Sequence, residues 1–277
     1  MKASAGGYAR AVDVPHALEL MAGSAGAGRY LAGGQSLVAA LNMRLSEGDM
    51  LIDISRIADL SGIREDGDHL RIGALTRHAD IGRDALIRTH APLLSDAVRH
   101  IAHAAIRNRG TIGGALAHAD PAAEFPACAL ALGATLHAQG GTGTRDIAAE
   151  EFFEDVFTTT LAEGEILTGL SVPKAEAGEV QVIEEVARRS GDYALTGLCL
   201  VRRAAGHRLS IFSAGPVPML ARGAMAALDA GDLDAAVEAL RAEIDPPSDT
   251  QASGSYRRHL AGVLLRRAVK RIEGDRA

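Results

Sequence analysis

Ala32-Gly33-Gly34-Gln35-Ser36 and Thr111-Ile112-Gly113-Gly114 each place a pair of glycines at the end of an apolar run. Glycine lets a ligand approach the backbone closely, and consecutive N–H groups can form a concave site for an anion such as a diphosphate. The hydroxyl groups of Ser36 and Thr111 can add hydrogen-bond donors. Each pair can equally be a tight turn, and the pattern alone leaves both interpretations open.

Neither glycine pair belongs to a standard nucleotide-binding fingerprint. Gly26-Ala27-Gly28 lacks the third glycine of a dinucleotide-binding turn, and it precedes a predicted strand instead of following one. The sequence has no Gly-Lys-Ser/Thr for a P-loop and no G-x-S-x-G nucleophile elbow. If the pairs bind a diphosphate, they do so outside these common motifs.

Strands and helices are mixed along the chain without the regular alternation of a doubly wound sheet. The first part has predicted strands at 30–32, 50–54, 69–74, 134–138 and 166–172, and predicted helices at 77–89, 92–105 and 122–132. The polar segment Lys174 to Glu179 then precedes predicted strands at 180–188, 195–204 and 208–214 and helices at 219–229, 232–243 and 254–273. This order indicates an α+β fold with two domains, 1–174 and 179–277.

The composition excludes several classes of function. Lys plus Arg is 29 and Asp plus Glu is 35, a net charge of −6, which argues against a nucleic-acid partner. Trp is absent and aromatic residues are 3%, so stacking platforms for single-stranded nucleic acid are not expected. No apolar run approaches the ~20 residues of a membrane span, and residues 1–7 lack the apolar core of a secretory signal. We expect a cytoplasmic protein.

The cysteine count limits the cofactors that the chain can hold. Cys128 and Cys199 are the only two cysteines, they lie in apolar surroundings, and they form no CxxC motif. A two-iron two-sulfur cluster normally takes four cysteine ligands, and a Cys-rich zinc site is excluded for the same reason. We expect buried, reduced thiols and no metal site in this chain.

Three weaker candidates have an ordinary structural alternative. His100 and His103 lie three residues apart on a predicted helix, which suits either a metal pair or a solvated helix face. His118 and Asp120 suit either metal ligands or a turn, since Asp120 precedes a proline. Tyr193, in a predicted loop between two strands, could stack on a planar cofactor or pack at the edge of the core.

Taken together in their order, the spaced motifs resemble the FAD-binding medium subunit of molybdenum hydroxylases. That family includes the medium chain of aerobic carbon monoxide dehydrogenase and the flavin domain of xanthine dehydrogenase. The resemblance covers nearly the whole chain. Its anchors are residues 32–37, 51–57, 70–76, 106–114, 117–122, 185–194 and 253–260.

The resemblance implies a fold. The N-terminal part should be a flavin domain of the vanillyl-alcohol-oxidase (PCMH) type, built from two α+β lobes. The C-terminal part should be a small domain with a three-stranded antiparallel sheet and a helical bundle. This division agrees with the boundary expected near 174–179.

The resemblance also implies roles for residues. The two glycine loops should hold the FAD diphosphate, Asp120 and Glu124 should lie near the ribityl chain, and Leu167 and Tyr193 should lie near the flavin ring. No catalytic group beyond the flavin is implied. The full set of expected cofactor-binding residues is Ala32, Gly33, Gly34, Gln35, Ser36, Leu37, Thr111, Ile112, Gly113, Gly114, Ala115, Asp120, Glu124, Leu167 and Tyr193.

Three positions depart from the pattern of the family. Gln35 stands where the carbon monoxide enzyme's chain usually has His, so the FAD should be bound noncovalently. Ala115 stands where many members have Asn or Ser, which removes a polar contact. Glu185 stands where some relatives carry Lys, and a lost positive charge near the ring would alter the flavin potential.

The function implied is that of an electron-transfer subunit. Electrons would pass from two iron–sulfur clusters in a small partner subunit to this FAD and then to an external acceptor. A large partner subunit would hold the molybdenum cofactor, and the assembly would be a dimer of heterotrimers. A free-standing FAD-dependent oxidoreductase of the same fold is the alternative. The substrate and the terminal acceptor are left open by this chain.

Overall fold

A computed structural model describes residues 6–46 and 50–274 of the chain. The first lobe is a small parallel sheet in the order β1 (Gly7–Arg10), β3 (Met50–Asp53), β2 (Gly28–Leu31). Helix α1 (Val14–Ala22) precedes β2, and its N-cap is Asp13, whose carboxylate accepts a hydrogen bond from the His16 N–H. Helix α2 (Leu37–Asn42) follows the first glycine pair. The first lobe thus presents this pair at the end of β2.

The second lobe is a five-stranded sheet covered by short helices. Its strand order is β4 (Ile63–Asp66), β5 (His69–Gly73), β10 (Ile166–Pro173), β6 (Thr135–Gly140), β7 (Gly143–Ala148), and all neighbours are antiparallel. The helices are α3 (His78–Ile81), α4 (Ala85–His90), α5 (Pro92–His100), α6 (Ala104–Arg107), α7 (Ile112–His118) and α8 (Glu124–Leu132). A two-stranded hairpin, β8 (Phe153–Asp155) with β9 (Thr158–Thr159), and the 3₁₀ turns Ala58–Leu60 and Ala149–Glu151 complete the lobe.

The C-terminal part is an antiparallel sheet with three helices. The strands β11 (Val180–Ala187), β12 (Ala194–Arg203) and β13 (Gly206–Phe212) form the predicted meander, and a short strand β14 (Met219–Leu220) extends it at one edge. The helices are α9 (Arg222–Asp229), α10 (Leu233–Glu243) and α11 (Gly254–Gly274). The helix predicted at 219–229 therefore begins three residues later, because its first residues pair with β13.

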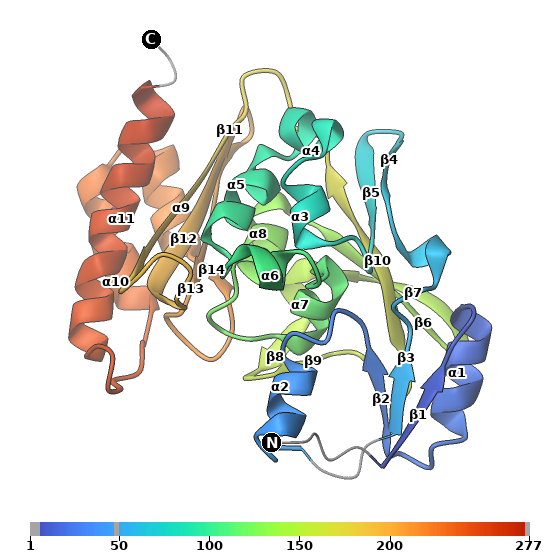
Figure 1. The fold of residues 1–277 in the computed structure, drawn as a ribbon. Coiled ribbons are helices and arrows are strands. Elements are labelled where there is room, and N and C mark those ends of the chain that lie inside the picture. The colour runs from blue at the N-terminus through green and yellow to red at the C-terminus, as the bar shows by residue number, and fades with distance from the viewer. Residues whose placement is uncertain (1–5, 47–49, 275–277) are drawn as a thin grey trace.

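The four-stranded sheet is buried on both faces. Along β12, Leu198 and Leu200 face the core formed with α9, α10 and α11, whereas Cys199 and Val201 belong to the core shared with α5 and α8. Figure 1 shows the three C-terminal helices on one side of this sheet and the helices of the second lobe on the other. The main core therefore contains residues from both sides of the segment 174–179.

Two long predicted helices are each split in the structure. The helix predicted at 77–89 is interrupted at Gly82, and Asp84 caps a new helix by accepting a hydrogen bond from the Ile87 N–H. The helix predicted at 92–105 ends after His100, and Ala102 has a left-handed backbone with φ of 41°. His100 and His103 therefore do not share one helix, which removes the geometry expected for a metal pair.

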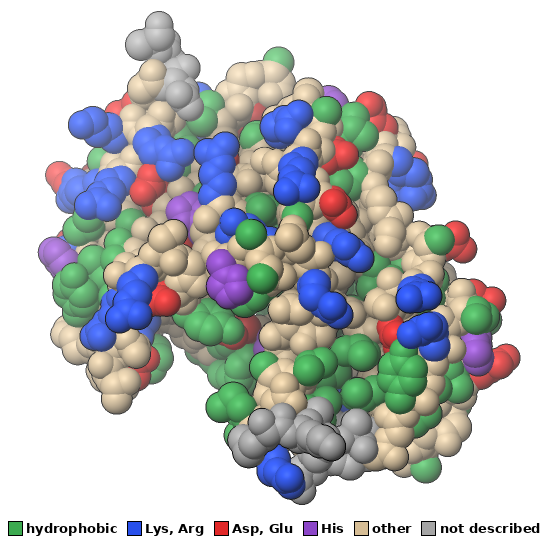
Figure 2. Space-filling view, in the orientation of Figure 1, with side chains coloured by type: hydrophobic (Ala, Val, Ile, Leu, Met, Phe, Trp, Pro, Cys, Tyr) green, Lys and Arg blue, Asp and Glu red, His purple; other side chains and the backbone are tan. Residues whose placement is uncertain are grey.

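Figure 2 shows that basic side chains gather over α11 and the helices beside it, with acidic side chains among them. Among the described residues, no helix has the length and apolar character needed to cross a membrane. The same residues contain no group of three or more His, Cys, Asp or Glu side chains that could hold a metal ion.

Candidate functional site: the glycine-loop cavity

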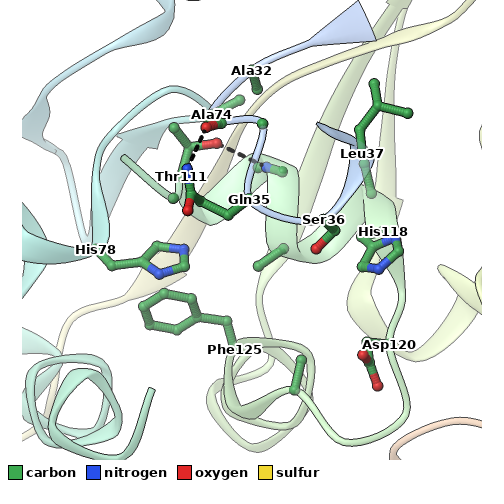
Figure 3. Close-up of a pocket in the computed structure, with 18 of the residues that line it drawn as sticks. Ala32, Gln35, Ser36, Leu37, Ala74, His78, Thr111, His118, Asp120 and Phe125 are labelled. Carbon is green, nitrogen blue, oxygen red and sulfur yellow. Dashed lines mark hydrogen bonds between the residues drawn. The ribbon is translucent and has the colours of Figure 1, made fainter. Parts of the chain in front are cut away.

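The glycine loops of the two lobes meet at a cavity of about 500 Å³, here called the glycine-loop cavity. Its size lies within the range of small-molecule sites. Fourteen of the fifteen residues predicted from the sequence line it, and they come from the β2–α2 loop, α2, the start of α7, the α7–α8 loop, α8, β10 and the β11–β12 loop. Ile112 is the exception, because its side chain is fully buried in the main core. Figure 3 shows part of this lining.

The two glycine loops are in direct backbone contact. A Cβ atom on Gly33 would lie 2.3 Å from the carbonyl oxygen of Arg109, and one on Gly113 would lie 2.4 Å from Cβ of Ala74. Gly34 has a φ of +72°, a backbone conformation that other residues rarely adopt. Close approach therefore requires glycine at Gly33 and Gly113, and backbone conformation favours it at Gly34.

The backbone N–H groups of the two loops are used differently. At the second loop, the N–H of Ile112 donates to the Thr76 carbonyl (3.0 Å), and that of Gly113 donates to the Ala74 carbonyl (2.8 Å). The N–H of Gly114 donates to Oγ1 of Thr111 (3.2 Å), which caps α7. These bonds anchor α7 to the β5–α3 segment, as the dashed lines in Figure 3 show in part.

At the first loop, the five consecutive N–H groups of residues 33–37 donate to no acceptor among the described residues. All five residues line the cavity. The side-chain amide of Gln35 folds back and donates to the Gly33 carbonyl (3.1 Å), which braces the loop from within. A run of unpaired N–H groups of this kind can donate hydrogen bonds to the oxygens of a diphosphate.

His78 is a lining residue that the sequence analysis missed. Its ring makes an edge contact with Phe125 at 5.0 Å between ring centroids, and neither ring nitrogen has a hydrogen-bond partner within the described part of the chain. Figure 3 shows the ring between the Gln35–Thr111 side and Phe125. Burial lowers the pKa of His78 to about 4, so the ring is neutral near pH 7. An unpaired buried imidazole on a cavity wall suits a polar ligand.

Two acidic residues, Asp120 and Glu124, also line the cavity. Asp120 precedes α8 and accepts a hydrogen bond from the Ala122 N–H (2.9 Å), which makes it the turn residue that the sequence also allowed. Glu124 is buried at the start of α8. Burial, together with the neighbouring Glu185 carboxylate, raises the pKa of Glu124 to about 8. His118 belongs to no group of three or more potential metal ligands in the described part of the chain, and its ring stacks on that of Phe157 with 4.8 Å between centroids.

Glu185 does not line the glycine-loop cavity. Its carboxylate lies behind the wall, 3.2 Å from Nδ1 of His100. Tyr193, by contrast, is 70% exposed on the β11–β12 loop. This loop separates the glycine-loop cavity from a second cavity of about 920 Å³, and Asp120 and Gly191–Tyr193 line both. Tyr193 is thus not an edge residue of the core.

Comparisons with known proteins agree over the whole chain. Residues 2–175 match the family described as the FAD binding domain in molybdopterin dehydrogenase, and residues 181–272 match the carbon monoxide dehydrogenase flavoprotein C-terminal domain. The chain is 36% identical to the 6-hydroxypseudooxynicotine dehydrogenase complex subunit alpha of Paenarthrobacter nicotinovorans, with 97% of this chain and 95% of the relative covered.

Two carbon monoxide dehydrogenases are similar in sequence and in structure. The chain is 36% identical to the carbon monoxide dehydrogenase medium chain of Afipia carboxidovorans, with 96% of each protein covered. A solved structure of carbon monoxide dehydrogenase from Hydrogenophaga pseudoflava superposes on this chain with a TM-score of 0.95 at 33% identity, covering 98% of both chains.

Proposed function

Because the chain belongs to the family of FAD-binding medium subunits of molybdenum hydroxylases, we propose that it passes electrons from iron–sulfur clusters of a partner subunit through FAD to an external acceptor. FAD, when bound, supplies chemistry that the side chains lack, because a flavin accepts electrons singly and delivers two. The chain's own part is to bind, orient and tune that cofactor.

The observation that carries this proposal is the run of five unpaired N–H groups at residues 33–37 on the cavity wall. The donor set of the cavity fits FAD. The first glycine loop would hold the diphosphate, while the second loop, whose N–H groups are already paired, would fix its position. His78 lines the cavity, and its two ring nitrogens, which are now closed off from solvent, would offer a donor or acceptor to the cofactor once the ring turned toward it.

The remaining predicted residues would surround the other parts of FAD. Asp120 and Glu124 would lie near the ribityl hydroxyls, and Leu167 and Tyr193 near the ring. Gln35 offers no imidazole for a covalent bond to the flavin, so the cofactor would be released by acid. We place the division between the FAD-binding domain and the C-terminal domain at 174–179.

The partners follow from the same assignment. A small subunit would hold two iron–sulfur clusters, and a large subunit would hold the molybdenum cofactor and the substrate. The two cysteines of this chain are buried and free, and they are too few for a cluster. We infer a dimer of heterotrimers, and we place it in the cytoplasm because buried free thiols are usual in a reducing compartment.

The test compares the purified chain with the complex isolated from its native host. We expect acid precipitation to release FAD from both, and we expect iron–sulfur absorption only in the complex. The absence of flavin from both preparations, even after incubation with FAD, would refute the proposal. A chain that binds FAD, stays alone in its host and oxidises a donor by itself would instead favour a free-standing oxidoreductase.

A further inference from the structure

Glu124, on the wall of the glycine-loop cavity, is electrostatically coupled to two titratable side chains behind that wall, Glu185 and His100, which contact each other. Glu124 begins α8 and lines the cavity, Glu185 lies on β11, and His100 ends α5. Helix α5 packs against both α8 and β11, which brings the three elements together. The trio thus connects the cavity wall with the domain junction.

Exposure and pairing differ along this trio. The side chain of Glu185 is 6% exposed and that of His100 is 33% exposed, so His100 reaches bulk water. One oxygen of Glu185 contacts His100, and the other, Oε2, has no hydrogen-bond partner among the described residues. A buried carboxylate oxygen without a partner is costly unless it shares a proton.

The charges of the trio favour one stored proton. Burial and the Glu185 carboxylate raise the pKa of Glu124 to about 8, so Glu124 keeps its proton near neutral pH. The Glu185 carboxylate, 3.2 Å from Nδ1 of His100, raises the pKa of His100 and so favours its protonated form. The trio therefore favours a proton on the cavity side and a positive charge on the solvent side.

We propose that Glu124 exchanges a proton with the flavin in the glycine-loop cavity, and that Glu185 and His100 connect Glu124 with bulk water. This inference rests on the proposed function, because it assigns residues around a bound FAD. Glu124 would act on the cofactor directly. Glu185 and His100 would be positioning and relay groups.

The proton balance of the step is simple. Near neutral pH, two-electron reduction of a flavin consumes one proton, and the electrons come from the partner's iron–sulfur clusters. Glu124 gives the proton from its carboxyl group and becomes a carboxylate. The His100 imidazolium returns a proton through Glu185, and water then protonates His100. When the external acceptor removes the two electrons, the same groups carry one proton outward.

Other titratable groups lie around the trio, and some of them shift the pKa values of Glu124 and His100. Asp120 on the loop before α8 raises the pKa of Glu124 slightly, and Glu184 on β11 raises that of His100. Cys128 and Cys199 are fully buried nearby, and burial raises the pKa of the Cys128 thiol well above its usual value. Burial also raises the pKa of Tyr193, and Asp120 and Glu124 add to this effect. His100 differs from these groups because it both contacts Glu185 and is partly exposed to solvent.

The first experiment titrates the FAD-loaded chain and follows protonated carboxyl groups by infrared spectroscopy. The wild-type protein should lose one buried carboxyl band between neutral and mildly alkaline pH, and Glu124→Gln should lack that band. Glu185→Gln should lower the midpoint of this titration and His100→Gln should raise it, each by roughly threefold or more in the proton binding constant. If Glu185 and His100 had only structural roles, the two substitutions would not shift the titration midpoint in opposite directions.

The second experiment measures proton uptake with an indicator dye after rapid photoreduction of the bound FAD. Glu124→Gln keeps hydrogen bonds to hydroxyl groups but cannot give up a proton, so uptake should slow by about a hundredfold. Glu124→Asp should restore part of the rate.

FAD content is measured first, so failure to bind FAD refutes the proposed function. Normal FAD content with wild-type midpoints and uptake rates in all variants refutes only this inference. If Glu124→Gln does not fold, the His100 and Glu185 variants decide the question.

Discussion

The α-carbon of Gly33 packs against the backbone of Arg109, so closely that a Cβ atom there would lie 2.3 Å from the Arg109 carbonyl oxygen. This contact joins the two lobes at the point where their glycine loops meet. It holds the unpaired N–H groups of the first loop beside the anchored start of α7. The distance between the two loops thus depends on the absence of one methyl group.

Gly33→Ala should weaken FAD binding by more than about tenfold, because the loops must separate to admit the new Cβ atom. The unfolding free energy should fall by about 1–3 kcal/mol, as is usual for overpacking. Gly141→Ala is the matched control, since a Cβ there meets nothing within 4 Å. Flavin absorbance after desalting and thermal unfolding measure both effects. Equal FAD retention by the two variants would contradict this role of the contact.

His78→Phe should separate stability from cofactor binding. The new ring can keep the edge contact with Phe125 while removing two buried nitrogen atoms that lack partners. The apo chain should then be as stable as the wild type, or more stable by on the order of 1 kcal/mol, whereas its FAD affinity should fall. His78→Gln, which keeps polar atoms, should bind FAD more tightly than His78→Phe. Fluorescence titration with FAD tests the order of the two affinities.

Glu124 should make the stability of the apo chain depend on pH. Its pKa is about 8 in the folded chain, against an ordinary value of 4.5, so between these values the unfolded chain has lost a proton that the folded chain retains. The contribution of Glu124 to the free energy of unfolding is therefore fully present at low pH, and it is lost as the pH rises toward 8.

Glu124→Gln should become more stable relative to the wild type as pH increases from 6 to 9, by on the order of 1 kcal/mol or more. The exposed Glu154→Gln is the control and should show no such trend. Urea unfolding at several pH values gives the comparison. A difference between Glu124→Gln and wild type that stays constant with pH would show that the carboxyl group is not held protonated.

Cys128 and Cys199 should be unreactive in the folded chain. Both are fully buried, their sulfur atoms lie 3.8 Å apart, and burial raises the pKa of the Cys128 thiol. A thiol reagent should label neither residue in native buffer and both in denaturant, because the reactive thiolate is disfavoured. Ser255→Cys, at an exposed position, provides the positive control. Native labelling at the rate of that control would contradict the buried arrangement.

Several features of the site were predictable because they are local. Glycine pairs after apolar runs predicted the loops, and Thr111 was a sensible hydroxyl donor, although its Oγ1 accepts a hydrogen bond within α7 instead. Helix breaks were less predictable. The interruption at Gly82 and the left-handed Ala102 depend on how short helices pack over the five-stranded sheet, which overrides local helix preference.

His78 shows why part of the site could not be predicted. In sequence it follows Thr76-Arg77 in a polar stretch that resembles the start of an exposed helix. In the structure it is buried against Phe125, and its backbone N–H donates to the Gly110 carbonyl. The one sequence signal for His78 is its position two residues after the 70–76 anchor. A local sequence pattern does not predict that a side chain will be buried against a residue that is distant in the sequence.

The α+β class and the two glycine loops could be predicted from the sequence, because they depend on residue types and short-range spacing. The three-dimensional packing was needed to show that the N–H groups of residues 33–37 donate to no acceptor among the described residues, while those of Ile112 to Gly114 are used. It also placed His100, Glu185 and Glu124 together from three elements. Such proximity arises from packing between distant segments, and the resulting burial sets the charge of each group.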